Sequence, residues 1–328
     1  MFGVSITSQK IERSAVIAYL CIIFLEHMHR FDLAISYTWN YDKEFVNLVE
    51  NIFQSAKLKT FVIERFNVQE VIELLKNKEV SFGAYLDRAS DEDPDFVPIY
   101  KILSRRKCYI INPHWKVNRA VNKSFTHKKL DKKNYALPKT FIISAFDADE
   151  KLKLKEEDLD YLKRPFVIKP ALFSGGGEGV EPHGMTLEQI QNERMKSPTE
   201  QYLIQEKIHP RTIENKRAWF RIFWAFGDVI PTWWDDHTHI YNIITPAQIK
   251  KYQLQPLMRI TRKLARMNGL DYFSTEIALT TNHRFVLIDY VNDQCDMRLK
   301  SEHFDGVPDE VVSSFIKSMK KRIIDLKK

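Results

Sequence analysis

The stretch that decides the fold is FVIKPALFSGGGEGV, residues 166–180, in which an apolar strand carrying Lys169 runs into a glycine-rich loop. Gly175, Gly176 and Gly177 allow positive φ and a close approach of the backbone to a ligand. Consecutive backbone N–H groups in such a loop can line a phosphate, while Lys169 supplies a fixed charge. The alternative is a hairpin loop with an incidental lysine. The Walker pattern is absent, because no Gly-Lys-Ser/Thr follows.

Further strands are expected on the C-terminal side of this loop. The run QYLIQEKIHP (201–210) ends in backbone groups that could pair with an adenine edge, with Ile208 packing on the ring. The runs FSTEIALTT (273–281) and RFVLIDYVN (284–292) form a predicted strand pair that presents the side chains of Glu276, Asp289 and Asn292. Oxygen ligands of this kind suit Mg²⁺. The alternative is that these acids simply face water, but Asp289 follows the apolar run FVLI and needs compensation if it is buried.

The chain from Phe31 to Pro113 alternates between strand and helix patterns, which predicts a parallel twisted sheet. No G-x-G-x-x-G follows the first strand, so NAD binding is not expected there. Before it, the apolar run Ala15–Leu25 is too short to span a bilayer as a helix. Three interpretations compete for this segment: a signal or anchor, a packed helix, or an extension upstream of Met28, which we favour.

Bulk composition is that of a globular protein with two or three structural units. The chain has 328 residues, 44% of them hydrophobic, and a net charge of +7, which suits an anionic ligand such as a nucleotide. No dense basic run precedes the C-terminal tail, so we expect no nucleic-acid partner. The cysteines Cys21, Cys108 and Cys295 form no C-x-x-C pair, which favours a reducing compartment.

In this order and spacing, the motifs resemble those of the ATP-grasp family. The segment 122–140 resembles the helix that enters the fold, residues 166–180 its phosphate-binding strand and loop, QEKI its adenine hinge, RIFWAFGDVIP (221–231) its arginine strand, and the pair STEIALTT and LIDYVND its metal-binding strands. The resemblance implies an α/β fold with an N-terminal parallel-sheet domain over 28–114 and a two-lobed α+β module over 115–328. The N-lobe would cover about 115–205 and the C-lobe about 206–328, with 1–27 as a separate extension.

The resemblance also implies a site for ATP and Mg²⁺, with Mn²⁺ as an alternative. The metal ligands would be Glu276, Asp289 and Asn292, and Arg221 would contact phosphate. Nucleotide contacts would come from Lys123, Lys169, Ser174, Gly175, Gly176, Gly177, Gln205, Glu206, Lys207 and Ile208. Arg298 could clamp a substrate carboxylate in a bidentate fork or form a surface salt bridge.

Two departures from the family pattern stand out. Asp289 and Asn292 are three residues apart instead of two, so either the strand is bulged or Asp293 or Asp296 takes the place of Asn292. Ser274 and Thr275 stand where peptide-type ligases often carry an arginine.

The pair His237 and His239 is expected to place both rings on one strand face, as a metal site could. That arrangement makes substrate recognition or aromatic packing more plausible than a zinc site, since no third ligand stands at suitable spacing.

The implied activity is that of an ADP-forming ligase that joins a carboxylate to an amine through an acyl phosphate. The alternatives are an ATP-grasp kinase acting on a small molecule and a nucleotide-binding protein without turnover. The expected partner is a small molecule or a peptide, with a homodimer as an option. A cytoplasmic location without membrane contact is expected.

Overall fold

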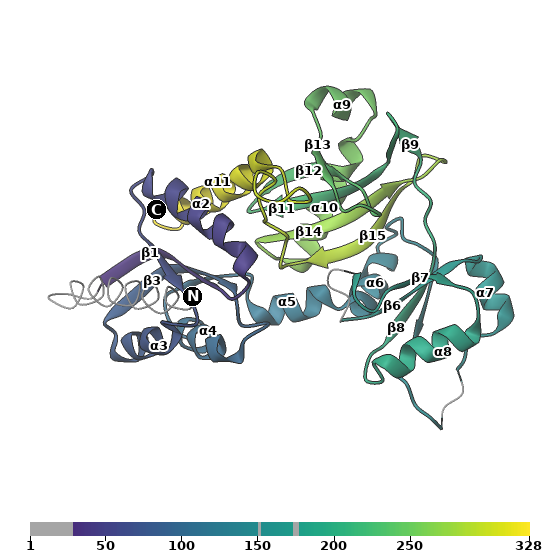
Figure 1. The fold of residues 1–328 in the computed structure, drawn as a ribbon, viewed down its shortest axis with the longest axis horizontal. Coiled ribbons are helices and arrows are strands. Elements are labelled where there is room, and N and C mark those ends of the chain that lie inside the picture. Colours follow the sequence, from purple (N-terminus) through teal and green to yellow (C-terminus); the bar gives the residue numbers. More distant parts are fainter. Residues whose placement is uncertain (1–28, 150–151, 173–176) are drawn as a thin grey trace, which may run out of the picture. The chain divides into compact units, whose positions relative to one another are not determined.

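The computed structural model describes residues 29–149, 152–172 and 177–328, so the N-terminal extension and Ser174, Gly175 and Gly176 lie outside the described part. The chain forms two compact units (Figure 1). Among the described residues, the first comprises 29–40 together with Glu50–Ile110, and the second comprises Tyr41–Val49 and the described part of 111–328. In the described residues, no helix is long and apolar enough to span a bilayer.

The first unit is built on the parallel sheet that the strand–helix alternation predicts. Strand β1 (His29–Tyr37) is central, with β2 (Thr60–Ile63) and β3 (Val80–Arg88) parallel on either side of it, in the order β2-β1-β3-β4. Buried residues of α3 (Val68–Asn77) and α4 (Val97–Leu103) pack on this sheet with Phe82 and Tyr85. The first unit also contains η2 (Pro94–Phe96), most of β4 (Tyr109–Ile111) and the end of α2 (Lys43–Gln54), whereas most of η1 (Asn40–Asp42) and the start of α2 belong to the second unit.

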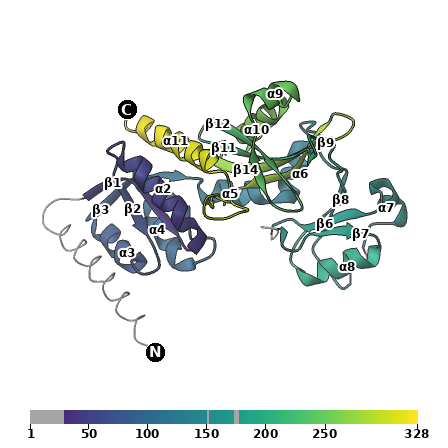
Figure 2. The same ribbon diagram turned by 45° about the horizontal axis from the view of Figure 1, so that its top comes forward.

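The second unit contains a four-stranded antiparallel sheet in the order β5-β8-β6-β7. Its core joins Phe166 and Ile168 of the sheet to Leu159 of α7 and Ile190 of α8, so both helices cover one face (Figure 2). The elements are β5 (Thr140–Ile143), α7 (Glu156–Leu162), β6 (Phe166–Pro170), β7 (Glu181–Gly184), α8 (Leu187–Lys196) and β8 (Tyr202–Glu206).

A five-stranded antiparallel sheet follows, in the order β13-β12-β11-β14-β15. Side chains alternate along β11. Phe220 and Ile222 join the core that α10 covers, and Arg221 therefore points to the opposite face. The elements are β11 (Trp219–Ala225), β12 (Asp228–Trp234), β13 (Tyr241–Ile243), α10 (Gln255–Asn268), β14 (Tyr272–Leu279), β15 (Phe285–Asn292) and α11 (Asp309–Asp325).

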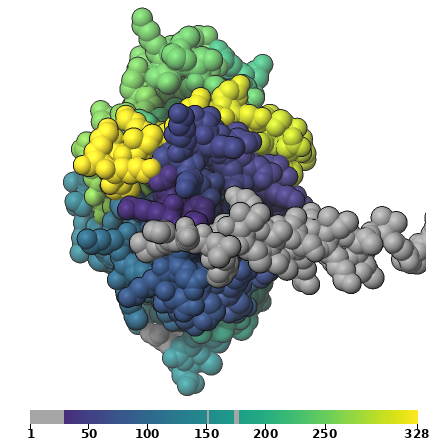
Figure 3. Space-filling view, turned by 90° about the vertical axis from the view of Figure 1, so that its left-hand side faces the viewer, coloured from purple at the N-terminus to yellow at the C-terminus, as the bar shows by residue number. Residues whose placement is uncertain are grey.

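Smaller elements complete this unit. A short ribbon pairs β9 (Thr212–Ile213) with β10 (Lys216–Arg217). Helix α9 (Pro246–Lys251) buries no residue, and the green segment that contains it projects at the surface (Figure 3).

Two local details differ from the sequence pattern. The pattern of residues 115–130 predicts one helix, but the segment forms two, α5 (His114–Val121) and α6 (Lys123–Asp131), because Asn122 leaves helical geometry and its side chain caps α6 by accepting from Phe125 N–H. The pattern of residues 246–269 predicts a long helix that stops at Gly269, and α10 does end there, with the short α9 before it. The expectation that His237 and His239 share a strand face is wrong, because both lie in the turn between β12 and β13.

Candidate nucleotide and metal site

Lys169 reaches from the four-stranded sheet to the five-stranded one. It lies on β6, is 6% exposed, and its Nζ donates to the carbonyl of Ile288 on β15 at 3.1 Å. The ammonium also lies 5.6 Å from the ring centroid of Tyr290. Burial lowers the pKa of Lys169 to about 8, even though the nearby Asp289 favours its charged form. A buried cation therefore lies beside the acidic strand.

Glu276 and Asp289 are direct partners across the β14–β15 pair. Two positions before Glu276, Ser274 pairs with Asn292, which is three positions after Asp289. Strand β15 thus carries one extra residue over this interval, which is a β-bulge. Of the two options that the three-residue spacing left open, the bulge is present, and it brings Asn292 into register with the acids.

Arg221 is a second cation of this region and is partly buried. Its guanidinium forms an ion pair with Glu276 Oε1 and lies 4.2 Å from the ring centroid of Trp234. Burial opposes its charge, but Tyr241, Glu276 and Asp289 hold the pKa of Arg221 above its usual value. The indole of Trp219 donates to the other oxygen of Glu276 at 3.1 Å.

Asp289 has an enclosed oxygen without an ordinary hydrogen bond. Its Oδ1 lies 3.5 Å from Lys123 Nζ, the far limit of hydrogen-bonding distance, and no hydrogen bond satisfies it. Burial alone would raise the pKa of this carboxyl, but the charges of Lys123, Lys169 and Arg221 hold it below its ordinary value. Asp289 is therefore ionised, and its Oδ1 can still coordinate a cation.

These residues suit a divalent metal held together with a polyphosphate. Two carboxylates and an amide from one strand pair provide hard oxygen donors, and each engaged oxygen of Glu276 retains a second lone pair. Three cations, the buried Lys123 and Lys169 and the partly buried Arg221, lie near the acids and could neutralise phosphate oxygens. Among the described residues no group of three or more His, Cys, Asp and Glu is placed to hold a metal, so the third ligand here would be Asn292.

The four residues of the expected hinge separate into two pairs. The side chain of Gln205 donates to Thr140 at 2.9 Å and to Tyr290 at 3.3 Å, and a Glu206 oxygen accepts from Lys139 N–H at 2.9 Å. Both side chains are therefore already engaged in hydrogen bonds within the protein. Lys207 and Ile208 follow the end of β8, and their backbone N–H groups make no hydrogen bond to a described residue. The backbone groups available to a ligand are therefore those of the second pair.

The glycine loop joins β6 to β7, which are antiparallel neighbours. Gly177 has a φ of 87°, and a Cβ added there would meet no atom within 4 Å. The first described residue after the gap therefore has the positive φ that the loop pattern predicts.

Arg298 is fully engaged with acids of its own loop. It donates to both oxygens of Asp296 at 3.0 Å and to both oxygens of Asp305 at 3.1 Å. Asp296, one of the alternatives to Asn292, is thus also committed to this cluster. The salt-bridge alternative describes this geometry, and a clamp for substrate would require Arg298 to exchange partners.

Sequence reasoning missed a buried hydrogen-bonded group behind the acidic strand. His127 Nδ1 lies 2.6 Å from the hydroxyl of Tyr290, which also accepts from Gln205. Burial lowers the pKa of His127 to about 4, so its ring is neutral near pH 7. The group links α6, β8 and β15, and the adjacency of Tyr290 to Asp289 was its one sequence signal.

Comparison with solved structures finds similarity over almost the whole chain, at low identity. D-alanine–D-alanine ligase from Bacillus anthracis, complexed with ATP, is 13% identical, with a TM-score of 0.61 over 91% of this chain and 98% of that one. The macrocyclase MdnC from Microcystis aeruginosa, bound with precursor peptide MdnA, is 13% identical, with a TM-score of 0.58 over 87% and 98%. The ATP-grasp ligase PsnB, complexed with precursor peptide PsnA2 and AMPPNP, is 10% identical, with a TM-score of 0.56 over 92% and 100%.

Comparison by sequence alone finds no similarity: no family model and no curated protein matches the chain. The similar structures nevertheless share one architecture, an α/β domain followed by antiparallel sheets, and they are ATP-grasp ligases. The chain therefore has the ATP-grasp fold.

Proposed function

We propose that this protein is a Mg-ATP-dependent ligase that joins a carboxylate to an amine and releases ADP and phosphate. The observation that carries the proposal is the meeting of Lys123, Lys169 and Arg221 around Glu276 and Asp289. Three enclosed or partly enclosed cations beside two carboxylates suit a polyphosphate that arrives with its metal. A site for an uncharged ligand would need neither the cations nor the carboxylates.

Each residue has a defined task in this proposal. Glu276, Asp289 and Asn292 would hold Mg²⁺, which supplies charge neutralisation between the phosphate oxygens. Lys123, Lys169 and the loop Ser174–Gly177 would bind phosphates, while the backbone of Lys207 and Ile208 would pair with adenine. Arg221 would neutralise charge that develops during phosphoryl transfer. Gln205 and Glu206 act by positioning the strand.

The chemistry follows from the family resemblance. A carboxylate oxygen attacks the γ-phosphorus, which gives an acyl phosphate and ADP, and an amine then displaces phosphate to form an amide. The protein positions the reactants and balances their charge. A peptide is one candidate for the carboxylate, since two of the similar proteins are bound to precursor peptides. In our proposal residues 28–114 precede the catalytic module 115–328.

The test measures ADP release with carboxylic acids, amines and polyols, singly and in pairs. Turnover that requires both an acid and an amine supports the ligase. Turnover with a polyol alone contradicts it and identifies a kinase. Tight ATP binding without ADP release contradicts turnover of any kind. Asp289→Asn and Asp293→Asn serve as matched variants, because Asp289→Asn should abolish Mg-dependent ADP release and Asp293→Asn should retain it.

A further inference from the structure

A concentrated positive charge lies behind the five-stranded sheet. Helices α5 and α6 with the residues up to 134, together with α10, contain eleven Lys and Arg and a single acid, Asp131. Their combined charge exceeds the net charge of +7 of the whole chain. Most of these cations are exposed, whereas Lys123 is buried at the candidate site. The excess of positive charge is therefore concentrated in these helices and accessible to a partner.

The fold brings these cations together from two distant parts of the sequence. Helix α5 contacts α6 and α10, and the amphipathic α10 buries Leu257, Thr261 and Leu264 against the sheet. Its outer side carries Arg259, Arg262 and Arg266, a row of one to two helical turns spanning about 10 Å. We call this row, with Lys116, Arg119 and Lys129, the basic face.

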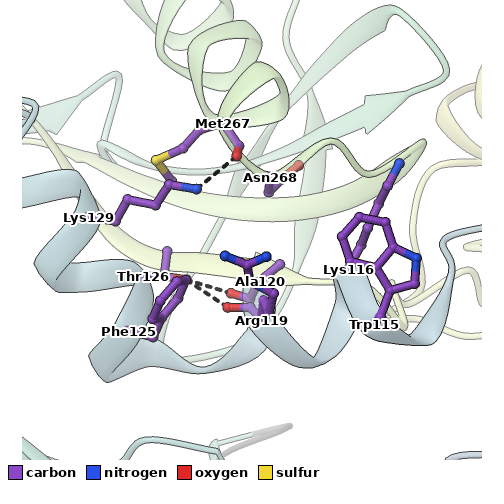
Figure 4. Close-up of a pocket in the computed structure, with 9 residues that line it drawn as sticks. All are labelled: Trp115, Lys116, Arg119, Ala120, Phe125, Thr126, Lys129, Met267 and Asn268. Atoms are coloured by element: carbon purple, nitrogen blue, oxygen red, sulfur yellow. Dashed lines mark hydrogen bonds between the residues drawn. The ribbon is translucent and has the colours of Figure 1, made fainter.

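A pocket of about 170 Å³ opens between α5, α6 and the end of α10. Its walls include Trp115, Phe125 and Met267 beside Arg119 and Lys129, with no acidic residue among them (Figure 4). Trp115 is 59% exposed and Phe125 43% exposed, which is unusual for large apolar side chains. Sites that enclose a whole small molecule measure roughly 300–1,000 Å³, so this pocket suits one side chain of a larger ligand.

The pocket is held in place by bonds to the end of α10. Lys116 Nζ donates to the carbonyl of Gly269 at 2.9 Å, and Lys129 Nζ donates to that of Met267 at 3.1 Å. Each ammonium has three donors, so both retain capacity for an anion. The walls are thus pre-organised, and the cations need no large rearrangement to bind.

The rings of the pocket are partly covered by cations. Arg119 lies 5.5 Å from the ring centroid of Phe125, and Lys116 lies 5.6 Å from that of Trp115. Nucleobases bind by stacking on open ring faces, so this arrangement disfavours single-stranded nucleic acid. Carboxylates suit it better, because guanidinium groups bind them bidentately while an apolar side chain fills the pocket.

From this arrangement we infer that the basic face docks an acidic polypeptide segment and that a bulky apolar side chain of the segment enters the pocket. The candidate nucleotide site is on the other face of the sheet, where Arg221 points. Docking is therefore independent of the proposed ligase activity and can be measured without turnover.

The probe is a fluorescein-labelled peptide of glutamates around one phenylalanine, titrated with the full-length protein and followed by anisotropy. Binding should weaken as salt is added, since exposed charges are screened. Replacing the phenylalanine of the probe by serine should weaken binding, which a purely electrostatic contact would not do. The double variant Arg262→Glu/Arg266→Glu should weaken it at least about tenfold, because attraction becomes repulsion at two positions.

The charge-matched control is Lys317→Glu/Lys321→Glu on α11, two exposed lysines on another helix. It should bind the probe as the wild type does, and thermal unfolding should show that both variants are folded. Equal loss in both variants, or a serine probe that binds as well as the phenylalanine probe, overturns the inference. Stronger binding of oligothymidylate or of phosphatidylserine vesicles than of the peptide would assign the face to a different partner and also overturn it.

Discussion

Replacing Lys169 by methionine should separate stability from nucleotide binding. The pKa of Lys169 falls from 10.5 to about 8. Each pKa unit corresponds to 1.36 kcal/mol, so holding this charge in the folded state costs about 3 kcal/mol near pH 7. Losing the bond to Ile288 O removes about 1 kcal/mol, while the attraction of Asp289 is already contained in the shifted pKa. The nucleotide-free variant should therefore be more stable than the wild type by about 2 kcal/mol.

The affinity for ATP should change in the opposite direction. A charge-assisted hydrogen bond contributes about 1.5–3 kcal/mol, so Lys169→Met should weaken Mg-ATP binding by roughly ten- to a hundredfold. Urea unfolding would measure the first quantity and titration calorimetry with Mg-ATP the second. Lys139→Met is the control, because Lys139 lies just before β5 and its Nζ donates to a carbonyl, that of Tyr161 at 3.1 Å. A variant that unfolds at clearly lower urea, or binds ATP unchanged while the control does too, would refute the reasoning.

Three further predictions concern the same region and the loop beyond it. The folded-state pKa of Lys169 lies below its unfolded value, so the unfolded chain binds more protons between about pH 8 and 10.5. The free energy of unfolding of the wild type should therefore rise with pH over this window relative to that of Lys169→Met, as measured by urea unfolding at several pH values. Asp289→Asn should keep the thermal unfolding midpoint within a few degrees but lose Mg-dependent ATP binding, because an amide is a weak ligand for a hard cation; calorimetry with saturating Mg²⁺ and normal affinity would contradict this. Gly306→Ala should destabilise the protein by about 1–3 kcal/mol in urea unfolding, because the added Cβ would lie 2.6 Å from the backbone oxygen of Leu299, whereas exposed Ser301→Ala should have little effect.

Much of the fold could be predicted because local patterns determine it. The apolar runs of β1, β3 and β14 and the amphipathic faces of α3 and α10 are visible in short windows. Breaks within helices were less visible. Asn122 is compatible with a helix interior in sequence, but in the fold its own side chain caps α6. Strands β12 and β13 were not foreseen, because the aromatic and polar residues around the β12–β13 turn obscure the alternation.

For the candidate site, the sequence could name residue types but not their contacts. It placed Lys169, Arg221, Glu276 and Asp289 in strands, and the structure brings these side chains together. It could not show that the side chain of Gln205 donates hydrogen bonds to Thr140 and Tyr290, or that Arg298 forms salt bridges with two acids. Such contacts join residues that are far apart in sequence, so they depend on the completed fold.

The bulge in β15 has a consequence for how relatives of this chain can be recognised. Asp289 and Asn292 are separated by two intervening residues along the chain, yet the residues opposite them, Glu276 and Ser274, are separated by one. A search pattern that fixes the number of residues between the two proposed ligands would miss this protein, although the ladder keeps them in register. Counting paired positions along the two strands, instead of residues along the chain, restores the match. An alignment of such proteins should therefore place its gap inside β15, so that the acid and the amide each stay aligned with their counterparts.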